Sequence, residues 1–348
     1  MGRGKTRRCR DWAGAALLAL LGAAGGCVTA PNPTLARFDF TQPQMGVPFR
    51  IVLYARDKAS ADVAAEAAFA RIKQLNDLLS DYDQDSELSR LSQTAGQGRA
   101  VPVSDDLWRV LAAGQRMAAR SKGAFDVTVG PCVSLWRKAR RERKLPDPTR
   151  LAAALKSVGD EKVELDGRRR TVKLLVPGMK LDLGGIAKGY AADEALKTLR
   201  QHGITRALVT AAGDMAASDP PPGQRGWRIE VAPLDVPDAP PARFVLLANR
   251  GLATSGDLFQ RLEIDGTRYS HIVDPRTGLG LTDHSLVTVI ARDGMTADAL
   301  ATAVSVLGPE KGLKLVERTP GAAAHVVRKP GEKIEVVESR RFGEFYEK

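Results

Sequence analysis

The stretch LDLGGIAKGY, residues 181–190, combines three glycines with an acid and a lysine in the pattern of a strand that turns into a helix. Gly184, Gly185 and Gly189 have no Cβ, so the backbone amides of this turn can approach an anion closely. The helix that follows, predicted over residues 186–202, begins with partial positive charge. The stretch therefore predicts a strand, turn and helix that bind a pyrophosphate or a similar anion.

A second stretch, TADALAT at residues 296–302, places Asp298 and Thr302 four residues apart on one face of a predicted helix. Carboxylate and hydroxyl oxygens suit a hard cation such as Mg2+, and we expect both side chains at a partly exposed site. Taken alone, Asp298 could equally favour the helix dipole and Thr302 could bond its own backbone. The opposite face of the helix is predicted to face the core through Leu300, Ala303, Val304 and Leu307.

The N-terminus has the pattern of a bacterial export signal. Basic residues precede an apolar run over residues 13–24, which is too short to span a bilayer and ends in Gly25-Gly26-Cys27. We interpret residues 1–27 as a lipoprotein signal peptide with Cys27 as the lipidated residue, and ordinary secretion with cleavage nearby as the alternative. Residues 28–42 predict a tether. The expected location is a lipid anchor at the cell membrane, on its extracytoplasmic (periplasmic) side.

The chain carries a net positive charge. The formal net charge is +11, of which the leader contributes +4, so the rest of the chain carries about +7. A cluster of six basic residues over 137–144 fits a solvated helix or loop face better than a nucleic-acid site, and we expect no nucleic-acid partner. The positive field favours a polyanionic small substrate. Cys132 is predicted to be a buried thiol without a disulfide.

Length and composition indicate a folded α+β protein with mixed, largely antiparallel sheets. The chain has 348 residues, 43% of them hydrophobic, enough for one large domain or two intimate subdomains over residues 43–348. Apolar spacing predicts a helix over residues 60–79, and Ser104 is the expected N-cap of another. Strands are expected at residues 207–210, 227–232, 244–248 and 285–291, and as a hairpin of 324–327 with 334–337.

Further short motifs accompany the two stretches quoted first. They are Met45-Gly46, LSDY (79–82), SELS (86–89), GAFDVT (123–128), AGD (212–214) and HIVDPRTG (271–278). With the two stretches, they resemble in order and spacing the ApbE family, the flavin transferases that move FMN from FAD onto a threonine of a target protein. The resemblance extends over about residues 40–342 and implies an ApbE-like, T-fold-related fold.

The resemblance also implies the site residues. Those implied for the FAD site are Met45, Tyr82, Ala124, Phe125, Asp126, Asp182, Lys188 and Ile272. Those implied as Mg2+ ligands are Asp298, Thr302 and the backbone carbonyl of Gly185. Without the family, Met45, Tyr82 and Phe125 would be read as core residues. Three departures from the family pattern concern loop shape: Val127 and Gly280 replace usual prolines, and Ser92 replaces a usual asparagine.

The same residues suggest a chemical mechanism. Breaking the pyrophosphate of FAD requires charge neutralisation, which Mg2+, Lys188 and the glycine turn would supply. His271 is a plausible base for the acceptor hydroxyl and Asp274 could orient it, although His271 alone would be read as structural. We therefore predict catalytic roles for His271 and Asp298 in Mg-dependent transfer of FMN from FAD to a threonine or serine, with release of AMP.

Two alternatives to this function stay open. One is an FAD pyrophosphatase that yields FMN and AMP, and the other is a flavin-binding lipoprotein without catalysis. If the chain is a transferase, the resemblance implies that its partner is an acceptor flavoprotein, either a membrane-bound redox subunit or another exported protein.

Overall fold

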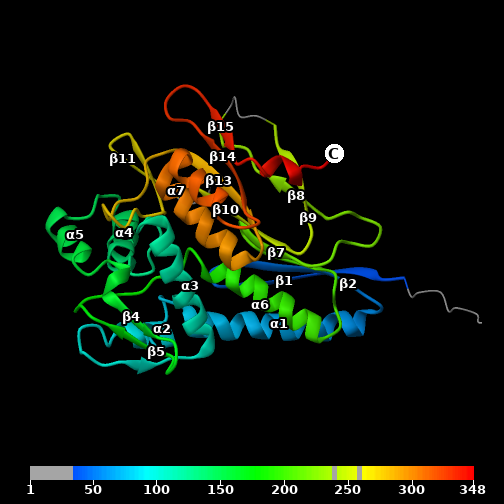
Figure 1. Ribbon diagram of the computed structural model, residues 1–348, viewed down its shortest axis with the longest axis horizontal. Coiled ribbons are helices and arrows are strands. Elements are labelled where there is room, and N and C mark those ends of the chain that lie inside the picture. Colours follow the sequence, from blue (N-terminus) through cyan, green and yellow to red (C-terminus); the bar gives the residue numbers. More distant parts are fainter. Residues whose placement is uncertain (1–33, 237–240, 257–260) are drawn as a thin grey trace, which may run out of the picture. The chain divides into compact units, whose positions relative to one another are not determined.

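The computed structural model describes residues 34–236, 241–256 and 261–348. Residues Leu35–Lys348 form one compact unit, in which the two expected subdomains are not separate bodies. At its centre lies an eight-stranded antiparallel sheet in the order β1-β2-β6-β7-β10-β13-β14-β15 (Figure 1). These strands are β1 (Ala36–Gln44), β2 (Val47–Ala55), β6 (Ala207–Ala211), β7 (Asp214–Ala217), β10 (Arg250–Gly256), β13 (Ser285–Ala291), β14 (Ala323–Arg328) and β15 (Glu335–Glu338).

Three long helices pack on one face of this sheet: α1 (Lys58–Leu79), α6 (Ala187–Gln201) and α7 (Gly294–Glu317) (Figure 1). Strand residues alternate between the two faces, so Ile51 and Leu53 lie in the core beneath the helices while Val52 belongs to the core on the other side. The helices complete the larger core with apolar residues that recur at helical spacing. In α1 these include Phe69, Ile72, Leu75 and Leu79.

A two-stranded ribbon covers the opposite face of the sheet. It pairs β8 (Trp227–Val231) with β9 (Arg243–Leu247), and both strands alternate buried and more exposed residues. Trp227 packs there with Phe342, which belongs to a short 3-10 helix at Phe342–Phe345. The middle of the central sheet is therefore buried on both faces, which explains why all seven residues of β13 are buried.

The remaining elements gather beyond one end of the helical layer, at the left of Figure 1. α3 packs against α7, and the β11–β12 hairpin shares a small core with α4, built around Trp136 and Leu262. The elements are α2 (Glu87–Ser92), α3 (Asp105–Ser121), α4 (Gly130–Glu142), α5 (Pro148–Leu155), a 3-10 turn (Asp160–Lys162), the sheet β3-β5-β4 (Val101–Pro102, Thr171–Leu174, Val163–Asp166) and the hairpin β11–β12 (Arg261–Ile264, Thr267–Ser270).

The α+β class and the largely antiparallel sheets are confirmed, as are the expected helices and strands to within two residues at most ends. Ser104 caps α3 by accepting a hydrogen bond from the Leu107 amide at 3.3 Å. Cys132 is fully buried, and this burial raises the pKa of its thiol to about 11, as expected for an inert core cysteine.

Two local predictions are wrong. The tether expected over residues 28–42 is contradicted for residues 36–42, because β1 begins at Ala36 and pairs with β2 along its whole length through a tight turn at Met45 and Gly46 with positive φ. Residues 28–33 lie outside the described residues. The glycine turn was expected to follow a strand, but Lys180 forms only an isolated bridge with Val129. The predicted signal peptide, with Cys27, lies outside the described residues. Within the described part, no helix is long and apolar enough to cross a membrane.

Candidate active site

The glycine turn leads into a close crossing of α6 and α7. A Cβ added to Gly189 would lie 2.2 Å from the carbonyl oxygen of Gly294, so only glycine lets the two helices approach this closely. The Gly189 amide donates to Oδ2 of Asp298 at 3.1 Å. Gly189 therefore serves helix packing and the positioning of Asp298, and its amide is not left for an anion as the sequence suggested.

Asp193 of α6 fixes the beginning of α7. Its two carboxylate oxygens accept hydrogen bonds from the amides of Gly294 and Met295, at 2.8 and 2.9 Å. The N-cap Asp293 accepts another from the Thr296 amide at 2.7 Å. These bonds satisfy the first amides of the helix, and so they set the register at which Asp298 and Thr302 follow.

Gly185 lies directly against two residues predicted for the site. A Cβ on Gly185 would come within 2.8 Å of the Thr302 hydroxyl oxygen and within 3.3 Å of the Phe125 ring. The backbone of the turn, the α7 hydroxyl and the aromatic ring thus meet although they are far apart in the sequence. Phe125 and Ala124 are both buried, so part of their role is core packing.

Lys188 occupies the centre of the charged site. Its Nζ lies 3.0 Å from Oδ2 of Asp214 and donates to the carbonyl oxygen of Gly184 at 3.0 Å. Burial alone would lower the pKa of this ammonium, but attraction by Asp214 and Asp298 outweighs burial and raises it. Lys188 therefore stays cationic at neutral pH, as the neutralisation of a phosphate requires.

Asp298 is only 2% exposed, which corrects the expectation of a partly exposed acid. Helix α7 is buried on most sides, so Asp298 shares the core with Leu300 and Val304 on the opposite face of the helix. Burial, followed by repulsion from Asp214, raises the pKa of the Asp298 carboxyl to about 7. A carboxylate in these surroundings is stabilised by any added positive charge.

The donor set fits a magnesium ion that is completed by its substrate. Asp298, Thr302 and the Gly185 carbonyl are hard oxygen donors. The Thr302 hydroxyl lies beside the Gly185 backbone, since a Cβ on Gly185 would be 2.8 Å from the hydroxyl oxygen. Among the described residues, no three His, Cys, Asp or Glu side chains are grouped as a metal site. Mg2+ commonly takes one or two carboxylates and completes its octahedron with phosphate oxygens and water.

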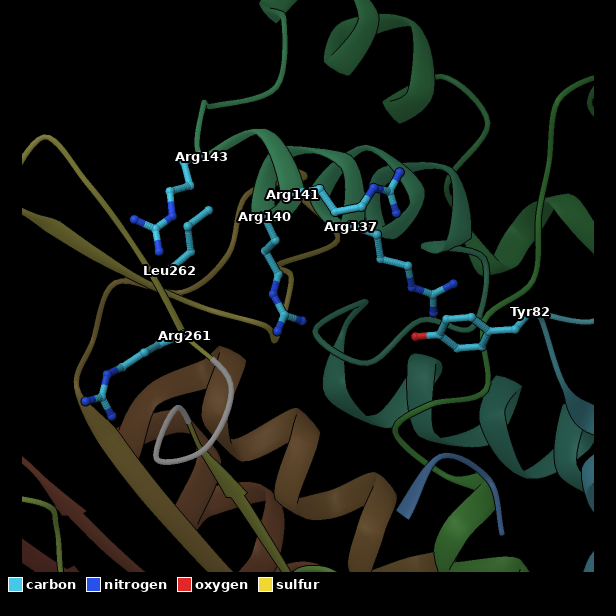
Figure 2. A pocket seen from close by; sticks show the side chains of 7 residues that line it. All are labelled: Tyr82, Arg137, Arg140, Arg141, Arg143, Arg261 and Leu262. Atoms are coloured by element: carbon cyan, nitrogen blue, oxygen red, sulfur yellow. The ribbon is translucent and has the colours of Figure 1, made fainter. Parts of the chain in front are cut away.

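Arg137 of α4 ties the glycine turn to the loop after α1. Its guanidinium bonds both Asp81 and Asp182, the latter at 3.0 Å, and stacks 4.0 Å from the centre of the Tyr82 ring (Figure 2). Burial and repulsion from Asp81 raise the pKa of the Asp182 carboxyl, while Arg137 opposes that shift. Tyr82 is 77% exposed, so its ring is available to a ligand on the other side.

Three of the residues predicted for the FAD site, Asp126, Ile272 and Met45, lie outside the helices and strands. Oδ1 of Asp126 accepts from the amide and hydroxyl of Thr128, at 2.8 and 2.7 Å. The Ile272 amide donates to the Ser270 hydroxyl at 3.1 Å. Met45 has φ of 50°, an uncommon backbone for its type, and packs against the main core. Their part in flavin binding stays a prediction.

The loop with His271 differs from its predicted arrangement. His271 is exposed, as a base that meets an incoming acceptor must be. Both carboxylate oxygens of Asp274, however, accept hydrogen bonds from Arg276, at 2.7–2.9 Å. Asp274 therefore stabilises its own turn. These bonds do not support the hypothesis that Asp274 orients His271.

Sequence reasoning missed three residues that shape the site: Arg137, Asp193 and Asp214. Asp214 stands in the AGD motif, whose acid follows a tight turn and could have been suspected as a partner for Lys188. Arg137 was grouped with a basic cluster and carries no separate signal. Asp193 looks like any acid on a helix surface until α7 is placed against it.

The chain matches a known protein family. The model of the ApbE family matches residues 45–326, which is most of the chain. The chain belongs to the ApbE family. Its relatives include an FAD:protein FMN transferase of Klebsiella pneumoniae, 33% identical over 340 residues, which cover 94% of this chain and 96% of the relative. A second, from Haemophilus influenzae, is 33% identical over 276 residues, covering 78% and 80%.

Solved structures of the ApbE family have the same fold. The apo form of the flavinyl transferase ApbE from Pseudomonas stutzeri matches with a TM-score of 0.79 and 33% identity, over 90% of this chain and 98% of that one. The flavin transferase ApbE from Vibrio cholerae matches with a TM-score of 0.81 and 29% identity, over 89% and 99%. These matches extend along nearly the whole described unit.

Proposed function

We propose that this protein transfers FMN from FAD to a hydroxyl of a target protein, with release of AMP. The observation that carries the proposal is the convergence of a cationic Lys188 with Asp298, Thr302 and Gly185 at the crossing of α6 and α7. An arrangement of one ammonium with hard oxygen donors suits a substrate whose reacting part is a pyrophosphate. The names of the relatives agree with this reaction.

Each residue has a defined part in the proposed reaction. Lys188, held by Asp214 and Gly184, stabilises negative charge on the pyrophosphate as the bond between the FMN phosphorus and the bridging oxygen breaks. Mg2+, held by Asp298, Thr302 and the Gly185 carbonyl, would supply further neutralisation of that charge. The acceptor oxygen bonds to the FMN phosphorus, AMP leaves with the bridging oxygen, and the hydroxyl proton passes to His271.

A metal-binding test separates this proposal from the reading in which Asp298 and Thr302 are only structural. Mg2+ with FAD is expected to raise the midpoint of thermal unfolding of the wild-type chain, because a bound ligand stabilises the folded state. Asp298→Asn, which keeps the shape of the side chain, should abolish the increment from Mg2+. If Mg2+ raises the unfolding midpoint of Asp298→Asn as much as that of wild type, Asp298 does not bind the metal.

We further propose that the acceptor is a threonine or serine of an exported or membrane-bound flavoprotein, and that Cys27 carries a lipid anchor on the periplasmic side. The basic leader and the Gly26-Cys27 pair support the anchor. Cys27→Ser should release the protein from the membrane fraction and leave its folded unit intact. A mature N-terminus without lipid, found by mass spectrometry of the native protein, would contradict the anchor.

A further inference from the structure

An open cavity of about 430 Å³ lies between α4 and the β11–β12 hairpin, beside Tyr82. Five arginines line it, four from the C-terminal half and end of α4 and one from the start of β11 (Figure 2). Leu262 adds one apolar surface. The arginines are Arg137, Arg140, Arg141, Arg143 and Arg261.

The arginines gather here because of the periodicity of α4. Cys132, Trp136 and Ala139 form its buried stripe, so Arg140 and Arg141 lie on the exposed side and Arg137, whose side chain is 22% exposed, lies at the border. Within residues 137–144 six side chains are basic and Glu142 is the one acid, which lies 3.6 Å from Lys138. Asp81 and Asp182 already pair with Arg137, and Asp235 lies 3.7 Å from Arg261, yet basic residues outnumber acidic ones around the cavity. This excess of positive charge attracts anionic partners and speeds their association.

The charge of this cavity exceeds what FAD requires. The pyrophosphate of FAD already has Lys188 and the proposed Mg2+ ligands on the α6–α7 side of the site. Guanidinium groups bind carboxylates in bidentate geometry, and several around one cavity suit a segment with several carboxylates. Its position beside Tyr82 would let a docked segment present a hydroxyl to the proposed flavin site, which favours a segment of the acceptor protein as the occupant.

We propose that this arginine-lined cavity is the docking surface for an acidic segment of the acceptor protein. The inference rests on the proposed function and adds the chemistry by which the partner is chosen. The arginines of this surface bind the Asp and Glu side chains of the acceptor. The reaction itself depends on Lys188, Asp298 and His271. Binding at this surface weakens as salt concentration rises, because the charges are exposed.

The test measures binding without requiring any transfer, so a failure of the proposed reaction cannot be mistaken for a failure of docking. The probe is a fluorescent peptide with one threonine among several Asp and Glu residues, compared with a peptide in which Gln replaces every acid. Fluorescence anisotropy with the purified full-length chain should show binding of the acidic peptide only. Arg140→Glu with Arg141→Glu should weaken that binding about tenfold or more.

Matched variants separate a specific loss of peptide binding from an effect of net charge or of misfolding. Arg168→Glu with Arg169→Glu changes net charge equally on an exposed turn that does not line the cavity, and it should leave peptide binding unchanged. Arg140→Gln with Arg141→Gln keeps the helix and should show an intermediate loss. FAD binding, followed by flavin fluorescence, should be the same in all of these proteins, which also shows that each is folded.

Three outcomes would overturn the proposal. The first is equal affinity for the acidic and the Gln-containing peptide. The second is equal loss of peptide binding in the Arg168/Arg169 variant. The third is that vesicles with anionic phospholipid or a DNA duplex, offered in separate arms, bind in an Arg140/Arg141-dependent way while the acidic peptide does not.

Discussion

The Nζ of Lys188 lies 3.0 Å from Oδ2 of Asp214, and this ion pair joins the first turn of α6 to the start of β7. The Asp214 side chain is 6% exposed and that of Lys188 25% exposed. Sequence reasoning assigned the lysine to the site without its partner. Asp214 keeps Lys188 charged and fixes the position of its ammonium group. Replacing Asp214 therefore tests both effects together.

Asp214→Asn should destabilise the fold and slow the reaction. Removing Asp214 takes away the nearest countercharge of Lys188. Asp298 and solvent still compensate part of that charge, so the expected cost is about 3 kcal/mol at most, the lower end of the usual range for a buried pair. Urea unfolding measures this loss. Glu310→Gln, which breaks the exposed Lys314–Glu310 pair on α7, is the control and should have no detectable effect. Equal stability of Asp214→Asn and wild type would contradict the proposed role of the pair.

Gly189→Ala should loosen the crossing of α6 and α7. The added methyl group would lie 2.2 Å from the Gly294 carbonyl oxygen, so backbone has to move, at a cost of about 1–3 kcal/mol or more. Gly343→Ala is the matched control, since nothing lies within 4 Å of its Cβ position, and it should stay within about 0.5 kcal/mol of wild type. Urea unfolding of both variants gives the comparison. Similar effects for the two would show that the crossing is not tight.

Arg137→Met should weaken FAD binding more than it slows turnover. Asp81 and Asp182 would then face each other without their shared cation, and Tyr82 would lose the guanidinium that holds its ring. We expect the KM for FAD to rise about tenfold, equivalent to about 1.4 kcal/mol. Steady-state kinetics at several FAD concentrations separate KM from kcat. A fall in kcat at unchanged KM would instead give Arg137 a part in the reaction itself.

His325 should make the fold sensitive to acid. It is buried on β14, 3.8 Å from Glu338 and near Phe342, and burial lowers its pKa below the ordinary 6.5 even though Glu338 opposes the shift. The unfolded chain therefore takes up the proton first, so this contribution to stability is complete above about pH 6.5 and is lost as pH falls through the lower, folded-state pKa. His325→Gln should lose less unfolding free energy than wild type between about pH 7.5 and pH 5.5. An equal loss in both proteins would assign the acid sensitivity to other groups.

Much of the fold was predictable because its signals are local. The helices α1, α3 and α6 follow from apolar spacing and caps, and β13 from its apolar run between turns. The predicted tether extended too far along the chain because β1 is a largely exposed edge strand without a buried stripe. Its sequence therefore resembles that of a linker. Only its pairing with β2 reveals it.

The site was predictable as a list of residues and less so as an arrangement. Asp298 was expected to be partly exposed because the sequence shows only one apolar face for its helix. In the structure α7 is packed between α6, α3 and the sheet. The partners Asp214 and Asp193 come from elements distant in the sequence, and no spacing rule connects them to Lys188 or to the start of α7. Contacts of that kind depend on the tertiary fold.

Covalent transfer of FMN would change the mass of the acceptor, so an intact-mass measurement of the acceptor checks the proposed reaction. The purified full-length chain is incubated with FAD, Mg2+ and a threonine-bearing acceptor domain from an exported flavoprotein, and the intact mass of the acceptor is recorded. The account predicts an increase equal to FMN less one water, absent with excess chelator, with Asp298→Asn, and when the acceptor threonine is valine. Free FMN and AMP with an unmodified acceptor would indicate a pyrophosphatase, and unchanged FAD would indicate a binding protein; either result would contradict the account.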